Sequence, residues 1–348
     1  MAKNIRLSDH FTYGKLLCFT LPSMVMMVFT SIYGVVDGLF VSNFVGKTAF
    51  ASVNLVMPFV MILGGMGFMI GTGGTALVSK ILGEGDPDNA NRTFSMMVLF
   101  TLALGVVLSG IGIAFMSPVA RFLGATDAMM ADCVLYGRIV TGFTFAFMLQ
   151  NVFQSFFIAA EKPKLGLKVT VAAGVTNMVL DALFIAVFKW GVAGAALATG
   201  IGQVVTLVIY LVIYRTVKLP LRLGRSYLRP NARLDKKLYA IGIPATLNLA
   251  LPSLLISALN AMLAAFSQAY VVILGIYYKL QTFLYLPASG IIQGMRPLIG
   301  YNFGAGEHRR VRSIYNVTLG LCAVIMAAGT AICFVFAGPL MAMFTDNP

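Results

Sequence analysis

Long apolar runs, separated by short segments rich in Gly, Pro and charge, follow one another along the whole chain. Each run is at least about 18 residues long, which is enough for a helix to cross about 30 Å of hydrocarbon. The pattern predicts nine membrane-spanning helices, near residues 16–43, 52–82, 93–116, 132–160, 168–188, 192–214, 238–265, 270–302 and 313–338.

The composition excludes a water-soluble domain. Of the 348 residues, 59% are hydrophobic and 11% are charged, and the mean hydropathy is +0.89. An average soluble domain has roughly 25% charged residues. The N-terminal segment MAKNIRLSDHFTYGK contains no short apolar stretch that ends in a small-residue cleavage site, so the first run is expected to span the membrane and not to be a signal peptide. The predicted fold class is an all-α integral membrane protein.

The net charge of +13 is unevenly distributed along the chain. If the N-terminus is cytoplasmic, 19 of the 25 Lys and Arg residues lie in or beside cytoplasmic segments, eight of them between Arg215 and Lys237. This asymmetry follows the positive-inside rule and predicts a multi-pass protein of the cell (inner) membrane with a cytoplasmic N-terminus. The basic loop also fits a nucleic-acid or regulatory patch. A topology anchor that touches anionic lipid is the preferred interpretation, and no nucleic-acid partner is expected.

Known motifs for metal binding, nucleotide binding and proteolysis are missing from the sequence. The four Cys and two His residues lack metal-ligand spacing and do not indicate a disulfide framework. The segment GGMGFMIGTGGTALVSK lacks the Gly-Lys-Ser/Thr ending of a phosphate-binding loop, so Gly67 and Gly71 are expected to mediate close helix packing. G-x-S-G does not occur, and the G-x-G-D match, GEGD at 83–86, lies in a charged segment between two apolar runs. We therefore expect neither an enzyme nor an ATP-driven pump.

An internal repeat organises the chain. KLLCFTLP at residues 15–22 recurs as KLYAIGIP at 237–244, an offset of 222, and GEGD at 83–86 recurs as GAGE at 304–307, an offset of 221. SPVARFL, which begins at Ser117, matches GPLMAMF, which begins at Gly338, again at 221. The matches predict two parallel six-helix repeats related by a pseudo-two-fold axis along the membrane normal, an architecture typical of transporters.

The second repeat is incomplete in this sequence. We divide the chain into an N-lobe of six helices at 1–215, a basic cytoplasmic inter-lobe loop at 216–236, and the first three helices of a C-lobe at 237–348. Counterparts of residues 131–215 are missing, so we expect a C-terminally truncated form of a protein of about 440 residues. The alternative, a natural nine-helix protein, would leave the second lobe with half of its packing surface.

Three segments resemble the multidrug and toxic compound extrusion (MATE) transporters: LPSMVMMVFTSIYGVVDGLFVSNFVG, KILGEGDPDNANR and PLIGYNFGAGEHRRVRS. The resemblance covers the whole chain. It implies twelve helices in two six-helix lobes that form a V. It also implies export of organic cations and other amphipathic compounds, coupled to inward flow of Na+ or H+. No cofactor beyond this coupling ion is implied, and the complete protein is expected to be a monomer in the bilayer.

Two of the twelve acidic residues, Asp37 and Asp181, lie well inside predicted spans. Counted at 1.5 Å per residue, both are about 10 to 12 Å from the outer face, level with Thr199 on the sixth helix. Asn177 precedes Asp181 by four residues and therefore shares its helix face. Three helices of one lobe thus place oxygen ligands at one depth.

An ionised Asp near the middle of a bilayer costs about 2.5 to 3.5 kcal/mol on insertion scales, so two of them require a cation, a proton or trapped water. The alternative is a hydrogen-bonded polar cluster that only holds helices together. In the DNA-damage-inducible branch of the MATE family, a cation site is built from an Asp on helix 1, an Asn-x-x-x-Asp pair on helix 5 and a Thr on helix 6. The resemblance implies such a site at Asp37, Asn177, Asp181 and Thr199.

Other polar residues are weaker candidates. Pro22 is expected to bend the first helix, either during state changes or as a passive kink. Lys279 lies deep in its helix and is a candidate for the second-lobe cavity. By resemblance, the remaining cavity-lining candidates are Tyr33, Tyr136, Gln150 and Asn151, for which an ordinary interhelical hydrogen bond is an equal alternative.

The second lobe contains fewer candidate ion-binding residues. The run 238–265 contains Asn248 and Asn260 but no acid, unlike sodium-coupled relatives that carry a carboxylate on the seventh helix. The predicted function is therefore a secondary antiporter with its ion site in the first lobe. The alternative is a flippase of lipid-linked saccharides from the same superfamily, whose cavity needs several Arg or Lys to neutralise a pyrophosphate. Only Lys279 is placed to do so.

The predicted orientation has a direct test in a variant without the native cysteines. A cysteine introduced at Lys47 should react with a membrane-impermeant thiol reagent in intact cells, whereas a cysteine at Ser226 should react only after the cells are opened. Labelling of Ser226→Cys but not Lys47→Cys in intact cells would mean that the orientation is inverted.

Overall fold

The computed structural model describes residues 5–217, 219–224 and 268–342, together with residues 255, 258, 259 and 262. This part of the chain is mostly helical and contains no strand, so the predicted all-α fold class is confirmed. Within it, six helices are long and apolar enough to span a membrane, and a bent helix pair makes up to seven. The predicted helix at 238–265 and most of the loop at 216–236 lie outside the described residues.

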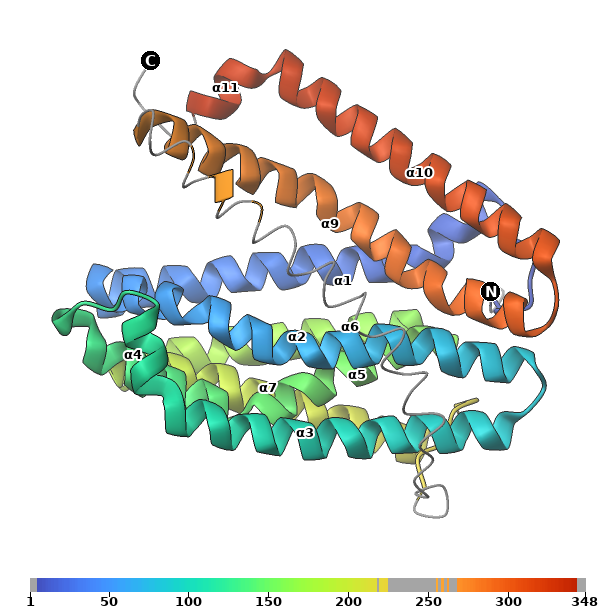
Figure 1. The fold of residues 1–348 in the computed structure, drawn as a ribbon, viewed down its shortest axis with the longest axis horizontal. Coiled ribbons are helices and arrows are strands. Elements are labelled where there is room, and N and C mark those ends of the chain that lie inside the picture. Colours follow the sequence, from blue (N-terminus) through green and yellow to red (C-terminus); the bar gives the residue numbers. More distant parts are fainter. Residues whose placement is uncertain are drawn as a thin grey trace.

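Figure 1 shows the arrangement of the helices. In the first lobe they are α1 (Tyr13–Phe40), α2 (Lys47–Gly83), α3 (Pro87–Phe122), α4 (Asp127–Gly142), α5 (Thr144–Ala159), α6 (Pro163–Asp181) and α7 (Gly191–Thr216). Two π-helical segments, η1 (Val41–Val45) and η2 (Ala182–Val187), continue α1 and α6. The second lobe contributes α9 (Gln268–Gly304), α10 (His308–Val335) and α11 (Ala337–Ala342).

The single helix predicted at 132–160 is wrong, because the span is broken into α4 and α5 with a bend of 50°. Phe143, between the two helices, has φ −97° and ψ 7°, and its backbone N–H donates to Val140 O three residues back. The ring of Phe143 lies against Gly200 of α7, where even a methyl group would overlap it. Apolar periodicity reveals neither the bend nor this contact.

The two repeats are visible in the helix bounds. Both α2 and α9 are 37 residues long, and both of their ends are offset by 221 residues. A left-handed glycine follows each helix, Gly85 with φ +84° and Gly306 with φ +74°, and α3 and α10 begin at the same offset. Glycine suits both turns because a side chain disfavours positive φ. The predicted repeat therefore extends to equivalent helices and equivalent turns.

The two lobes meet where α2 and α9 cross. A side chain at Gly83 would overlap the backbone oxygen of Tyr301, and a side chain at Gly304 would overlap the backbone oxygen of Lys80. The offset of 221 converts each contact into the other, since Lys80 corresponds to Tyr301 and Gly83 to Gly304. Such a reciprocal pair of contacts is the signature of a two-fold relation. The pseudo-two-fold axis therefore passes through this crossing.

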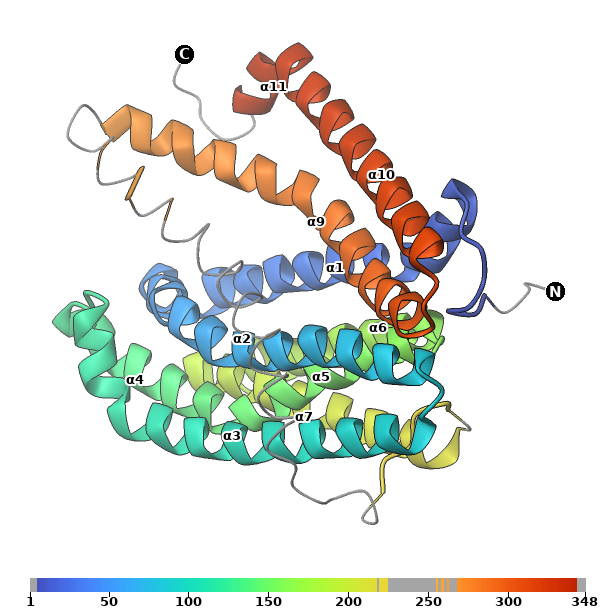
Figure 2. The ribbon, with the colours of Figure 1, turned by 45° about the vertical axis from the view of Figure 1, so that its right-hand side comes forward.

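A second contact joins the lobes beside Pro22, which is buried within α1. Gly290 of α9 lies against the backbone of Met24, and Gly294 lies against the side chain of Thr20. Figures 1 and 2 show that α9 and α10 approach the first lobe at the end near the N-terminus and diverge from it at the other end. In the diverging part of α9, Tyr277 is 57% exposed. The helices thus form the V that the resemblance implies.

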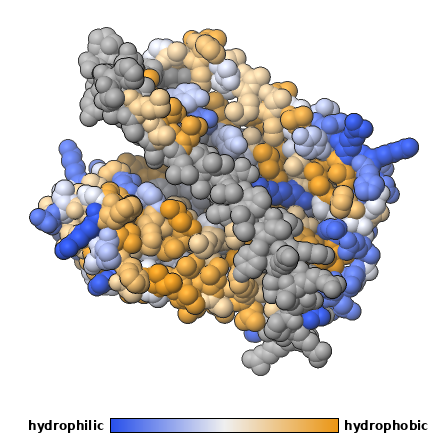
Figure 3. Space-filling model, in the orientation of Figure 1, coloured by the Kyte–Doolittle hydropathy of each residue, from blue (hydrophilic) through white to orange (hydrophobic). Residues whose placement is uncertain are grey.

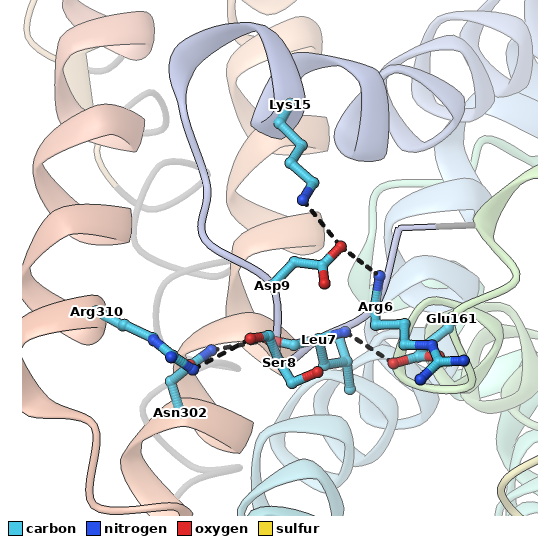
Figure 4. Close-up of polar contacts among 8 residues, drawn as sticks. All are labelled: Arg6, Leu7, Ser8, Asp9, Lys15, Glu161, Asn302 and Arg310. Atoms are coloured by element: carbon cyan, nitrogen blue, oxygen red, sulfur yellow. Dashed lines mark hydrogen bonds and ion pairs between the residues drawn. The ribbon is translucent and has the colours of Figure 1, made fainter. Parts of the chain in front are cut away.

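The N-terminal segment ties the two lobes together at the closed end of the V (Figure 4). The backbone N–H of Leu7 donates to Glu161 Oε1 at 2.7 Å, in the turn between α5 and α6. The oxygen of the same residue accepts from Asn302 Nδ2 of α9 at 3.0 Å, and Ser8 O accepts from Arg310 of α10 at 3.1 Å. Residues before the first helix therefore bridge both lobes.

A local ion pair holds this segment in its turn. Lys15 Nζ lies 2.9 Å from Asp9 Oδ2, and the backbone N–H of Arg6 donates to the same oxygen. The Lys15 ammonium beside it holds the pKa of the Asp9 carboxyl below its usual range. The carboxyl thus stays charged at neutral and mildly acidic pH, and its share of the turn's stability is lost only as the pH falls through that lowered pKa.

The predicted packing role of Gly67 and Gly71 is confirmed. A side chain at Gly67 would overlap the backbone of Met148, and one at Gly71 would approach Ser155 Oγ to 2.9 Å, so α2 and α5 are in close contact there. The outer surface of the helices is apolar and the two ends are polar, as Figure 3 shows for one face. This is the distribution that a bilayer requires.

The crossing of α2 and α9 makes a prediction about the closed end of the V. Gly83→Ala and Gly304→Ala should each push the two backbones apart and destabilise this closure by about 1 to 3 kcal/mol, the usual range for overpacking. Distances between spin labels on α3 and α10 near this end should lengthen or broaden in both variants.

Gly65→Ala is the matched control, because Gly65 also lies in α2 and a methyl group there meets no atom within 4 Å. Label distances that stay unchanged in Gly83→Ala and Gly304→Ala would show that this crossing does not determine the closure.

Candidate functional site

A cavity of about 150 Å³ lies inside the first lobe, between α1, α2, α4, α5, α6 and α7. Three of the four predicted cation-site residues line it, namely Asp37, Asn177 and Thr199. The other lining residues are Thr30, Tyr33, Gly34, Met57, Val60, Met61, Tyr136, Val140, Phe147, Gln150, Ala173, Gly202, Gln203 and Thr206. The predicted candidates from three helices, α1, α6 and α7, thus gather around one space.

The carboxyl groups of Asp37 and Asp181 lie close enough to interact directly. Asp37 is 8% exposed and Asp181 is fully buried. Asp37 Oδ1 and both carboxyl oxygens of Asp181 are buried without a hydrogen-bond partner in the described part of the chain. Buried carboxyl oxygens without donors are costly, and unpaired groups of this kind call for an ion, a proton or water.

Small residues bring the three helices together around Asn177. A methyl group at Gly174, one turn before Asn177, would overlap the ring of Phe29 on α1. On the other side, a methyl group at Gly202 of α7 would stand 3.5 Å from Asn177 Cβ. Close approach of α1 to α6 therefore depends on Gly174, whereas a methyl group at Gly202 would make an ordinary van der Waals contact. The buried Asn177 lines the cavity together with Asp37 of α1 and Thr199 of α7.

Both carboxylates directly precede a π-helical segment. η1 begins four residues after Asp37, and η2 begins at the residue after Asp181. The wider turns are closed by i→i−5 bonds, Gly46 N–H to Val41 O at 3.1 Å and Phe188 N–H to Leu183 O at 2.8 Å. The two segments contact each other. π-Turns are rare and frequently mark functional sites, and the sequence pattern, which predicts continuous helices here, did not reveal them.

The weaker candidates are distributed unevenly. Tyr33, Tyr136 and Gln150 line the cavity, and the Tyr136 hydroxyl lies within electrostatic range of both carboxylates. Asn151 is not among the lining residues, since its side-chain amide donates to Phe147 O one turn back at 3.0 Å. Lys279 belongs to α9, but its side chain lies outside the described residues, as do Asn248 and Asn260.

The sequence analysis missed several polar lining residues. Gln203 and Thr206 follow Thr199 on α7 at spacings of four and three residues and therefore share its face. The Thr206 hydroxyl donates to Gly202 O at 2.7 Å, whereas Gln203 Oε1 is buried without a described partner. The helical spacing of these three polar residues within an apolar run was the signal that identifies them.

The size and chemistry of the cavity suit a small cation. Its volume of about 150 Å³ is below the 300 to 1,000 Å³ that is typical of drug-sized ligand sites. Carboxylate, amide and hydroxyl oxygens are the ligands that hard cations prefer. Of the described residues that line the cavity, none is a Lys or Arg. The geometry thus favours a proton or a small metal cation over a drug-sized ligand in this cavity.

Comparison with known proteins gives a family match. The sequence matches the family model described as MatE over residues 22–183 and 244–348. Similar proteins include the Multidrug export protein MepA of Staphylococcus saprophyticus, 26% identical over 329 residues that cover 94% of this chain and 73% of the relative. The protein of the same name from Staphylococcus aureus is 25% identical over 329 residues, which again cover 94% of this chain and 73% of the relative.

The fold also matches solved structures. One is described as the outward-facing conformation of a multidrug resistance MATE family transporter of the MOP superfamily. It matches with a TM-score of 0.90 and 21% identity, and the match covers 97% of this chain and 75% of that one. At this identity the likeness concerns the fold alone. It agrees with the V formed by α9 and α10 against the first lobe.

Proposed function

The chain belongs to the MatE family, and from this premise we propose that it is a secondary active antiporter that exports amphipathic, mainly cationic organic compounds. The exchange is with Na+ or H+, bound at Asp37, Asn177, Asp181 and Thr199. Members of this family are transport proteins and not enzymes. The relatives named as multidrug export proteins support the substrate class.

The observation that carries the proposal is the buried carboxyl pair. Asp37 and Asp181 come from different helices of a membrane-embedded lobe, interact with each other, and leave three carboxyl oxygens without described donors. Two ionised carboxylates can only accept hydrogen bonds, so direct contact between them requires a shared proton or a cation. Here a bound cation or proton supplies the missing positive charge, so the pair suits reversible ion binding.

Ion binding at this site can affect the second lobe through α1, because α1 carries Asp37 and also packs on α9. With the ion absent, repulsion between two carboxylates favours separation of α1 from α6, and a cation removes that repulsion. The other part of α1, at Thr20 and Met24, packs on Gly294 and Gly290 of α9. Pro22 stands between these two contact residues and lacks a backbone N–H, which weakens the helix there. A change at Asp37 is thereby coupled to the contact between lobes.

The organic substrate is proposed to bind between the lobes, because the cavity around Asp37 is too small for a drug-sized molecule. A flippase of lipid-linked saccharides is the less favoured alternative. Its pyrophosphate needs Arg or Lys, whereas the charged residue among the described cavity-lining side chains is Asp37. We further propose that the protein acts as a monomer in the cell membrane with its N-terminus in the cytoplasm.

The direct test of the proposal, like the variant test below, uses the complete protein with all helices of the second lobe and measures transport in reconstituted vesicles. Export of a fluorescent organic cation should follow an imposed Na+ gradient, a pH gradient, or both, when each is applied separately. Counterflow of the ion should accompany the dye. Dye movement that ignores both gradients would refute the antiport proposal, and movement of a lipid-linked saccharide in its place would support the flippase.

The carboxyl pair makes a sharper prediction. Asp37→Asn and Asp181→Asn preserve size and hydrogen bonding but remove the titratable charge, so each should lower gradient-driven efflux by about tenfold or more at unchanged membrane abundance. Efflux per molecule and abundance should be measured in the same cells.

Asp127→Asn is the control, because Asp127 is exposed in the first turn of α4, and its efflux should stay near that of the unmodified protein. Abundance that falls in step with activity in the Asp37 and Asp181 variants would instead favour a purely structural polar cluster. Unchanged efflux in both would remove the ion from this site.

A further inference from the structure

A larger cavity, of about 490 Å³, lies on the flank of the first lobe between α3 and α7. Both helices pack on α5, which separates them. Beyond α7, the chain turns back towards α3, where Arg222 N–H donates to Asn91 Oδ1 at 2.7 Å and Gly224 N–H donates to Ser95 Oγ at 3.4 Å. The result is a groove with two helical walls and one end closed by residues 219–224. We call it the α3–α7 groove.

The walls of the α3–α7 groove are apolar and accessible. The lining residues of α3 repeat at helical spacing from Ser95 to Leu102, and those of α7 repeat from Val208 to Arg215. Six apolar lining residues are more than a third exposed, namely Leu99, Leu102, Val208, Leu211, Val212 and Leu223. In a membrane-embedded lobe such a surface faces acyl chains and not water. The groove therefore opens sideways to the bilayer.

The closed end of the α3–α7 groove is polar. Arg215, in the last turn of α7, lines it and is exposed. The Tyr214 hydroxyl, on a side chain that is 8% exposed, is buried and has no hydrogen-bond partner in the described part of the chain. Ser95 Oγ also lines this end. One cation and two hydroxyls therefore stand where an apolar slot meets the edge of the membrane.

We propose that the α3–α7 groove binds an anionic phospholipid of the surrounding bilayer. One acyl chain lies between α3 and α7, and the phosphate meets the Arg215 guanidinium, whose fork matches phosphate oxygens. Basic pockets between spanning helices are known to select anionic lipid head groups.

The groove lies apart from the proposed ion site and from the space between the lobes. It lies on the face of α3 and α7 away from α9, and none of its lining residues lines the cavity around Asp37. The charge at its end, Arg215, is opposite to that of the ion site. The groove therefore suits a resident lipid that stabilises the first lobe and not the exported cation.

The single tryptophan of the chain, Trp190, allows a fluorescence test. In a Trp190→Phe background, Leu102→Trp places a probe in the groove. Ala103→Trp is the matched control, because Ala103 is the next residue of α3, is exposed, and does not line the groove. Each variant is reconstituted in vesicles that contain a small share of brominated phosphatidylglycerol or brominated phosphatidylcholine, and quenching is measured.

The groove probe should be quenched more strongly by brominated phosphatidylglycerol than by brominated phosphatidylcholine. The affinity for the anionic lipid should be about fivefold higher, the ratio expected for one arginine near a phosphate. The control probe should show no preference. Arg215→Gln should abolish the preference at Leu102→Trp, and Tyr214→Phe should reduce it.

Two results would overturn the proposal. If Leu102→Trp and Ala103→Trp showed the same preference for the anionic lipid, the groove would not bind that lipid selectively. A groove probe that neither lipid quenches, beside a quenched control, would mean that protein fills the groove. Circular dichroism of each variant verifies that the lobe is folded.

Discussion

The structure depends on the reciprocal backbone contact at the pseudo-two-fold axis, where Gly83 faces Tyr301 O and Gly304 faces Lys80 O. Backbones approach this closely only where side chains are absent, so the two lobes meet through glycines and peptide oxygens at this crossing. Beside this crossing, a buried apolar cluster joins the lobes through Phe19 of α1, Leu298 of α9 and Ile314 of α10. The N-terminal segment, through Leu7, adds hydrogen bonds at the same end. One end of the V is therefore held while the other end is spread.

The repeat is symmetric in shape but asymmetric in chemistry. The helices α2 and α9 agree in length and in their following turns, because packing and backbone geometry constrain both copies. The buried carboxylate has no such counterpart, since the offset of 222 places Leu259 at the position of Asp37. The carboxyl pair lies in the first lobe, and α1, which carries Asp37, also contacts α9. In our proposal, an ion bound at the pair acts on the interface through α1.

Much of the architecture was predictable from the order of residues. Apolar runs of membrane length predict the spans, because a bilayer leaves a helix few alternatives. The KLLCFTLP and GEGD repeats predict equivalent helices, and α2 and α9 agree with that prediction. The depths of Asp37 and Asp181 follow from counting residues along rigid helices, and the structure brings their carboxyl groups together. Their role as a cation site stays a prediction.

Other features arise only when distant segments meet. The ring of Phe143, at the bend between α4 and α5, packs against Gly200, which is 57 residues away along the chain. The π-segments after Asp37 and Asp181 contact each other, and the α3–α7 groove needs two helices and a returning loop to form. The sequence determined the spans, the repeat and the depth of each charge, since these follow from hydrophobicity and helix rise. The tertiary structure decided which small residues permit close approach and which buried oxygens lack a partner, because packing is a property of pairs of segments and not of either one alone.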